Sequence, residues 1–124
     1  MKFIDANVII KAFIDNEDKN KCRKILSGDF VTNTLCLVEA QHGISIIKSN
    51  KIYASNCIKS LFKSHGIIIE LNKDLLFETF RRIEKYDLNI FDLIHYVTAL
   101  MHNCPEFVSY DKDFDDLEIK RVEP

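Results

Sequence analysis

Short apolar runs alternate along this chain with longer segments whose apolar residues recur at helical spacing. The run from Ile67 to Leu71 is continuous and rich in β-branched side chains, which is typical of a strand buried in a parallel sheet. Comparable runs predict the other strands, which are Lys2 to Asp5, Phe30 to Thr32, Phe107 to Tyr110 and, at an edge, Ile119 to Val122.

The segments between these runs are predicted to be helices, several of which begin at a residue type that commonly caps a helix. Thr34, Asn72 and Asn89 are the expected N-caps of three helices, and Gly66 is expected to stop a fourth. The predicted helices run from Ala6 or Asn7 to Phe13, from the turn at Asp15 to Asp18 as far as Leu26, from Thr34 past Ile46, from Lys51 to Ser64, from Asn72 to Lys85 and from Asn89 to Met101.

This order of elements predicts an α/β fold. Strands that alternate with helices form a parallel sheet with helices on both faces. We therefore expect a Rossmann-type three-layer α/β/α architecture with a mostly parallel sheet of four or five strands. The 124 residues fit one domain, 1–124, without a linker or repeat. Ligands bind such folds outside the carboxyl ends of the strands, where Asp5 and Asp111 fall.

Charge narrows the classes of function only slightly. The formal net charge is −2 and 29% of the residues are charged, so the chain lacks the broadly basic character of many nucleic-acid-binding domains. An RNA substrate remains compatible with this charge, because basic residues can cluster locally. The candidate clusters, for which a solvated helix face is the plainer interpretation, are Lys48 with Lys51, Lys59 with Lys63, and Arg81, Arg82 and Lys85.

The four cysteines have no CxxC spacing, so we expect neither a zinc site nor a disulfide framework. A reduced, cytoplasmic compartment fits this usage best. The first apolar run contains Asp5 and is cut short by Lys11, which is unlike a signal peptide. No stretch approaches the roughly 20 apolar residues of a membrane span, and we expect no membrane association.

Three carboxylates stand alone inside apolar stretches of a chain that is otherwise dense in charge. The intervals without another formal charge are Lys2 to Lys11 around Asp5, Asp29 to Lys48 around Glu39, and Asp87 to Glu106 around Asp92. Burying a carboxylate is costly unless something compensates the charge, and a shared cation would compensate all three. Separately, Asp5 could cap the following helix, Glu39 could hold a backbone amide or a lysine, and Asp92 could be an exposed acid.

The surroundings of Asp92 favour a buried position. At about 100° per residue, Asp92 lies nearly opposite the apolar stripe of its predicted helix. Its neighbours on that side are Phe91, Tyr96 and Ala99, so the helix is apolar nearly all round and its acid is expected to face a cleft. His95, one turn further on, is expected to be a satisfied structural histidine or to orient a substrate.

The last acidic segment has Asp111, Asp113 and Asp115 at alternate positions, as in a calcium loop. An EF-hand needs Gly at the sixth place and Glu at the twelfth. Asp116 and Val122 occupy those places here, so the sequence excludes an EF-hand. The strand that ends at Tyr110 is predicted instead to deliver Asp111 into a cleft beside Asp5.

Together these segments resemble the four acidic blocks of the PIN domain family. The blocks are Phe-Ile-Asp-Ala-Asn-Val-Ile-Ile around Asp5, Leu-Val-Glu-Ala around Glu39, Phe-Asp-Leu-Ile-His-Tyr-Val-Thr-Ala-Leu around Asp92, and Ser-Tyr-Asp-Lys-Asp-Phe around Asp111. They keep their order over nearly the whole chain. The resemblance implies a metal-dependent ribonuclease in which these four acids are catalytic metal ligands, Asn7 and Ser109 are supporting polar residues, and Asp115 assists through water. The choice of Asp111 over Asp113 or Asp115 stays open.

Carboxylate ligands favour Mg²⁺ or Mn²⁺ as the cofactor. Small stand-alone members of the family are often VapC-type toxins. The resemblance therefore implies an RNA substrate, with tRNA one candidate, a VapB-like antitoxin whose tail occupies the acidic cleft or supplies a basic residue to it, and a homodimer. A catalytically silent PIN-fold module that binds RNA or protein is the alternative.

A phosphatase of the haloacid dehalogenase type is a rival among enzymes that form an aspartyl phosphate. Such an enzyme needs a second Asp where this chain has Asn7. A response-regulator receiver would need an acidic pair after the first strand. The predicted helical positions of Glu39 and Asp92 fit neither class.

Overall fold

A five-stranded sheet in the order β3-β2-β1-β4-β5 forms the centre of the computed structural model, which describes residues 1–124, and every strand pairing is parallel. The strands are β1 (Lys2–Ile4), β2 (Phe30–Asn33), β3 (Gly66–Ile69), β4 (Glu106–Val108) and β5 (Lys120–Val122). The predicted α/β class and parallel sheet are therefore confirmed.

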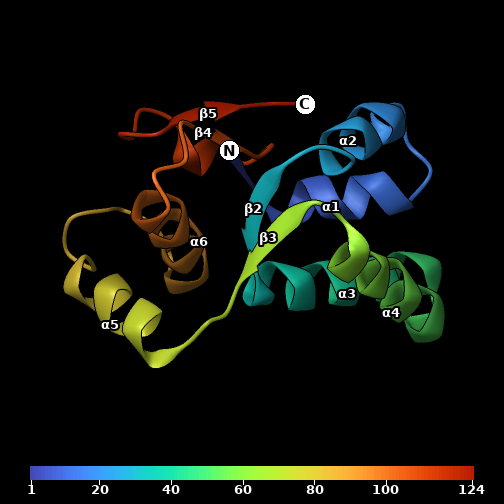
Figure 1. The fold of residues 1–124 in the computed structure, drawn as a ribbon, viewed down its shortest axis with the longest axis horizontal. Coiled ribbons are helices and arrows are strands. Elements are labelled where there is room, and N and C mark those ends of the chain that lie inside the picture. Colours follow the sequence, from blue (N-terminus) through green and yellow to red (C-terminus); the bar gives the residue numbers. More distant parts are fainter.

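Helices lie on both sides of this sheet (Figure 1). One group contains α1 (Ala6–Phe13), α2 (Lys19–Leu26), α3 (Thr34–Lys48) and α4 (Lys51–Ser60), and the other contains α5 (Lys73–Arg81) and α6 (Ile90–Met101). Two short 3₁₀ helices, η1 (Leu61–Lys63) and η2 (Lys112–Phe114), complete the structure. The predicted three-layer α/β/α architecture is therefore confirmed.

An aromatic cluster packs beneath the carboxyl end of the central strands. The rings of Phe3 in β1 and Phe107 in β4 stack with centroids 4.9 Å apart, and Phe114 lies 4.3 Å from Phe107. Tyr96 of α6 lies 5.9 Å from Phe107, and its hydroxyl accepts a hydrogen bond of 2.8 Å from the Ile119 N–H. This packing fixes β1, β4, α6 and η2 relative to one another, and these elements carry or adjoin three of the four acidic blocks.

Gly66 begins β3, so the prediction that it stops the preceding helix is wrong. Helix α4 ends at Ser60 and continues into the single turn η1. Gly66 pairs with Phe30 of β2, and a Cβ at Gly66 would lie 2.2 Å from Cζ of that ring. The glycine is required because the Phe30 side chain occupies the space of its missing side chain.

Replacing Gly66 by Ala is therefore expected to lower the free energy of unfolding by about 1–3 kcal/mol, the usual cost of overpacking a well-packed site. Denaturant titration of the variant measures this loss. Gly28→Ala is the matched control, because the nearest atom to its Cβ would be the Ile25 carbonyl oxygen at 3.8 Å. Equal unfolding midpoints for the two variants would contradict the packing argument.

Three further predictions of local structure need correction. The strand β3 lies at an edge of the sheet and Ile67 is 44% exposed, so its apolar run is not fully buried. Asn33 caps α3 in place of Thr34, whose hydroxyl instead accepts the Leu71 N–H at 3.0 Å. Helix α5 ends at Arg81, earlier than the predicted Lys85.

The helices of this structure are all too short or too polar to cross a membrane. All four cysteines are buried and free.

Candidate metal centre

Asp5 follows β1 directly and begins α1. Its Oδ1 accepts the Ala6 N–H at 2.8 Å, and its Oδ2 accepts the Ser109 hydroxyl at 2.7 Å. Burial raises the pKa of Asp5, while His95 and these hydrogen bonds act in the opposite direction. Asp5 therefore caps its helix, as one sequence interpretation held, and is also a buried carboxylate.

Ser109 and Asn7 connect the carboxyl ends of β1 and β4. The Ser109 hydroxyl, which donates to Asp5, accepts the Asp111 N–H at 3.0 Å and the Asn7 side-chain amide at 3.1 Å. The Asn7 side-chain oxygen in turn accepts the Tyr110 N–H at 3.3 Å. Both predicted supporting residues thus hold the segment after β4 against Asp5.

Asp92, Asp111 and Asp113 form a group whose carboxylate oxygens lie within 4.8 Å of one another. Asp92 stands in the first turn of α6, where the Asn89 side-chain amide donates to its Oδ2 at 3.0 Å. Burial, followed by the charges of Asp5 and Asp111, raises the pKa of Asp92 to about 6. Asp92 is intermediate in burial, so it is less enclosed than the buried position that its sequence neighbours favoured.

Asp115 lies apart from this group, because it accepts a hydrogen bond of 2.5 Å from Arg121 Nε. The same guanidinium donates to the Ser109 carbonyl oxygen at 2.9 Å. Asp113 is the residue that joins Asp92 and Asp111, and its N–H donates to Asp111 Oδ1 at 2.9 Å. Among the alternate acids left open by the sequence, geometry therefore groups Asp113 with Asp111.

Glu39 reaches the same region from α3, with a side chain that is 36% exposed. Its Oε1 lies 2.5 Å from Nε2 of His95, and its charge contributes to raising the pKa of both Asp5 and Asp92. Neither a lysine nor a backbone amide contacts its carboxylate. Asp92 is therefore within electrostatic reach of the other three predicted acids, whereas the group of close carboxylates contains Asp111 but neither Asp5 nor Glu39.

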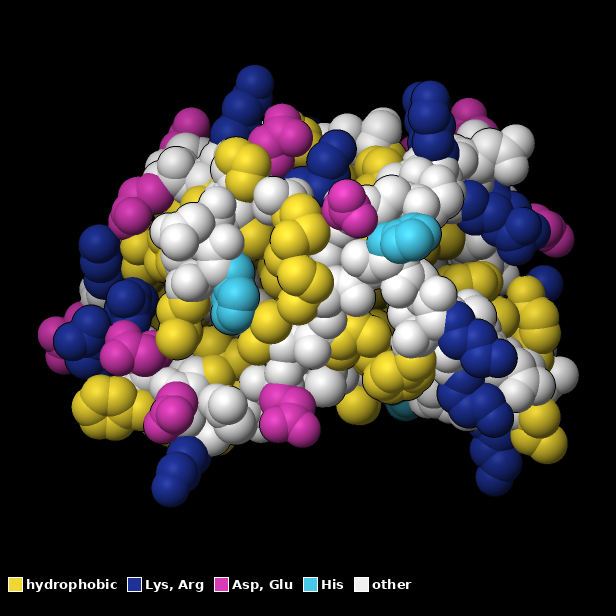
Figure 2. Space-filling view, in the orientation of Figure 1, with side chains coloured by type: hydrophobic (Ala, Val, Ile, Leu, Met, Phe, Trp, Pro, Cys, Tyr) yellow, Lys and Arg dark blue, Asp and Glu magenta, His cyan; other side chains and the backbone are white.

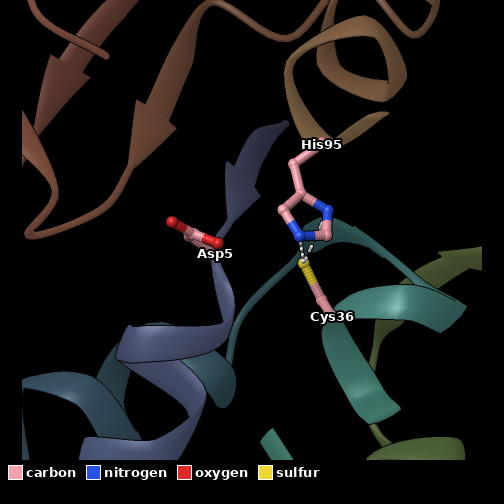
Figure 3. Close-up of side chains that lie close together, drawn as sticks. All are labelled: Asp5, Cys36 and His95. Atoms are coloured by element: carbon pink, nitrogen blue, oxygen red, sulfur yellow. Dashed lines mark hydrogen bonds between the residues drawn. The ribbon is translucent and has the colours of Figure 1, made fainter. Parts of the chain in front are cut away.

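The contact between Glu39 and His95 was not found by sequence reasoning. His95 is 1% exposed and meets Cys36 of α3 through a contact of 3.3 Å between its Nδ1 and Cys36 Sγ. Figure 3 shows His95 and Cys36 beside Asp5, at the junction of α6, α3 and the end of β1. The only signal in the sequence was the position of His95 one turn after Asp92.

The donor set at this edge of the sheet fits a hard divalent cation. Its ligand atoms are carboxylate oxygens, which Mg²⁺ and Mn²⁺ prefer. The raised pKa of Asp92 means that its negative charge is poorly compensated by the protein alone. A cation between Asp92, Asp111 and Asp113 would relieve that repulsion, so the residues present fit the implied metal.

Lys112 lies within the acidic segment, between Asp111 and Asp113, and the other basic side chains are spread over the surface. On the face in Figure 2 they lie mainly toward the outline, and a column of them lies over the side of α3 and α4. Exposed lysines of these elements and of η1 are Lys48, Lys51, Lys59 and Lys63. Arg81 and Arg82 pair with Glu78, and Lys85 pairs with Glu118, which supports the solvated-face interpretation for that group.

Comparison with known proteins gives a match to one family model and to several solved structures. The sequence model of the PIN domain matches residues 2–120. No curated protein matches the chain in sequence.

Solved structures with this fold include VapC20 from Mycobacterium tuberculosis, a toxin that cleaves the sarcin-ricin loop (TM-score 0.82, 11% identity, 100% of both chains covered). A toxin–antitoxin complex from Klebsiella pneumoniae matches with a TM-score of 0.76 and 16% identity over 98% of this chain and 96% of the other. VapBC2 from Rickettsia felis, bound to a DNA fragment from its promoter, matches with a TM-score of 0.70 and 16% identity over 99% and 98%. At such low identity these structures establish the fold alone.

Proposed function

This chain belongs to the PIN domain family, and on that premise we propose that it is an endoribonuclease that depends on Mg²⁺ or Mn²⁺ and hydrolyses RNA phosphodiester bonds. The observation that carries the proposal is the group of Asp92, Asp111 and Asp113 next to the buried Asp5, with the pKa of Asp92 raised to about 6. Acids that only make a surface soluble stay in contact with water, and burial does not raise their pKa.

Asp5, Glu39, Asp92 and Asp111 are proposed to bind the cation, with Asp113 beside them. The cation supplies Lewis acidity toward water and toward the phosphate oxygens. Asn7 and Ser109 keep Asp5 oriented, since Ser109 donates to its Oδ2. Asp115 is proposed to act only indirectly, because Arg121 holds its carboxylate.

Side chains that could act as covalent nucleophiles are poorly suited to that role here. Burial raises the pKa of the Cys36 thiol, which disfavours the reactive thiolate. The Ser109 hydroxyl is fully buried, and its oxygen already accepts hydrogen bonds from the Asp111 N–H and the Asn7 side-chain amide, so it is not free to attack a phosphate. Both features support hydrolysis by water.

The biological role that we propose is the toxin of a toxin–antitoxin pair, because proteins of similar fold occur in such pairs. A VapB-like antitoxin would then be the partner, with a tail that reaches the acidic cleft or supplies a basic residue to it. An apolar groove of about 450 Å³ between α3 and α4, lined in part by Leu37, Val38, Ile58 and Phe62, suits the apolar face of an antitoxin helix.

We also propose a homodimer and a cytoplasmic location, where thiols stay reduced.

A catalytically silent module that binds RNA or protein is the alternative. Replacing Asp5 by Asn distinguishes the two, because this change removes a proposed ligand and retains the shape of the side chain. An enzyme is expected to lose cleavage of labelled single-stranded RNA by about 100-fold or more and to keep RNA binding. Binding by the wild type without cleavage under Mg²⁺ or Mn²⁺ would favour the silent module.

A further inference from the structure

A series of hydrogen bonds, buried except at Glu39, connects Glu39 to the backbone at the start of α3. Its central member is His95, whose Nε2 faces Glu39 Oε1 at 2.5 Å and whose Nδ1 faces the side-chain nitrogen of Asn33 at 3.0 Å. The ring comes from α6 and Glu39 from α3, so the contact joins two layers of the fold. The contacts of these side chains determine which atom donates in each hydrogen bond.

The orientation of the Asn33 amide is fixed by the backbone. Its side-chain oxygen accepts the Cys36 N–H at 2.8 Å, which is the N-cap bond of α3. Its nitrogen must therefore point toward His95 and Thr98, whose hydroxyl lies 3.0 Å away. The Thr98 hydroxyl gives its own proton to the Ile94 carbonyl oxygen at 2.7 Å. One amide hydrogen of Asn33 thus goes to Thr98, and the other goes to His95.

This arrangement determines which nitrogen of His95 carries a proton. An amide nitrogen only donates, so Nδ1 of a neutral ring must accept from Asn33, and the proton of that ring must be on Nε2. A charged ring has a proton on Nε2 as well. The contacts exclude the neutral tautomer with its proton on Nδ1. In a charged ring the Nδ1 proton would face Cys36 Sγ, which lies 3.3 Å from this nitrogen, in place of the Asn33 amide. Nε2 therefore donates to Glu39 whichever charge the ring has.

We propose that His95 is a positioning residue that holds one oxygen of Glu39, Oε1, so that Oε2 is presented to a divalent cation at the acidic cluster. The proposal rests on the proposed function, because it needs a cation at that cluster. Glu39 is only partly buried and stands on a helix apart from β1, β4 and α6. Without a donor in the adjacent layer, its side chain would be free to turn toward solvent. Cys36 also contacts this ring, with its Sγ 3.3 Å from Nδ1 and 3.8 Å from Nε2 (Figure 3).

The test is the affinity for Mn²⁺, measured by titration with electron paramagnetic resonance on the purified full chain. Replacing His95 by Leu removes the donor and puts an apolar side chain in the buried space. This change is expected to weaken Mn²⁺ binding by about 10- to 100-fold, as loss of a residue that orients a metal ligand does. His95→Gln, whose amide places an N–H near the former Nε2, is expected to recover most of the affinity. His65→Leu is the matched control, because His65 is exposed and lies just before the amino end of β3, at the end of the strand opposite to the acidic cluster.

Two outcomes would overturn the inference, and they differ in what else they overturn. A wild type that binds Mn²⁺ and cleaves RNA, together with a folded His95→Leu variant of equal affinity, would contradict the role of His95 alone. A wild type that neither binds Mn²⁺ nor cleaves RNA would contradict the proposed function as well.

Nuclear magnetic resonance of the wild type gives a second measurement that does not require the variant to fold. Correlations between the ring nitrogens and carbon-bound protons identify the tautomer of each histidine, and through-bond correlations from the backbone to the ring assign the signals of His95 in the wild type itself. A proton on Nε2 is the expected result. A neutral ring with its proton on Nδ1 would overturn the inference.

Discussion

Replacing Asp92 by Asn is expected to lower RNA cleavage by about 100-fold or more and, at the same time, to make the cation-free protein more stable. The loss of cleavage follows from removal of a proposed metal ligand. The gain in stability follows because burial and the charges of Asp5 and Asp111 disfavour the ionised carboxylate, and they raise its pKa to about 6. Asn has nearly the same shape and no charge.

The gain should depend on pH. The folded protein holds its proton on Asp92 more tightly than the unfolded chain, whose carboxyl has the ordinary value of 3.8. The stability linked to this group is therefore complete at low pH and is lost as pH rises through about 6. Because the side chain is only partly buried, solvent screening reduces the effect, and we expect a gain of about 1 kcal/mol for Asp92→Asn above pH 7.

Thermal unfolding in EDTA at pH 5 and pH 8 measures this difference. About 1 kcal/mol corresponds to a rise in Tm of about 4 °C for a chain of this size. The advantage of the variant should be complete at pH 8 and about half as large at pH 5, which lies between the unfolded and folded pKa values of Asp92. Asp87→Asn is the matched control, because Asp87 is exposed and lies outside the acidic group. A variant at position 92 that is less stable than wild type at pH 8 would contradict the account of a strained carboxylate.

Addition of Mn²⁺ is expected to stabilise the wild type strongly, and this is the second large effect. A ligand that binds only the folded state at about 100 times its Kd adds about 2.7 kcal/mol, which corresponds to a rise in Tm of about 10 °C. EDTA should reverse the rise. The effect arises because the cation neutralises the repulsion among Asp5, Asp92 and Asp111 that burial makes costly.

The Tm shift should depend on the acidic group itself. The double variant Asp92→Asn, Asp111→Asn should respond little to Mn²⁺, whereas Asp87→Asn should respond like the wild type. A shift of equal size in the double variant would mean that Mn²⁺ binds elsewhere on the surface.

The pattern of apolar runs predicted the positions of the strands because those signals are local, and the alternation of strands with helices predicted that the sheet is parallel. Phe30 to Thr32 and Phe107 to Tyr110 lie within one residue or two of the observed β2 and β4. The exposure of Ile67 could not be predicted in the same way. The edge position of β3 depends on which side of β1 each crossover connection leads to, and a single run of apolar residues carries no information about that.

For the candidate site too, local features could be predicted from the sequence, and contacts between distant residues could not. Isolation in apolar sequence drew attention to Asp5, Glu39 and Asp92, because a lone charge in such a stretch needs compensation wherever the chain folds. The pairing of Asp115 with Arg121 and the contact of His95 with Glu39 depend instead on side chains that meet only in the folded molecule. The residues were visible in the sequence, and their partners were not.

Cleavage of labelled single-stranded RNA and of total tRNA by the purified wild type, in Mn²⁺ or Mg²⁺ and in EDTA, tests the central claim most directly. The account predicts cutting that requires the divalent cation and is lost in Asp92→Asn, although that variant stays folded. Cutting that persists in EDTA, or that Asp92→Asn retains at the wild-type rate, would contradict an active site built on this group of carboxylates.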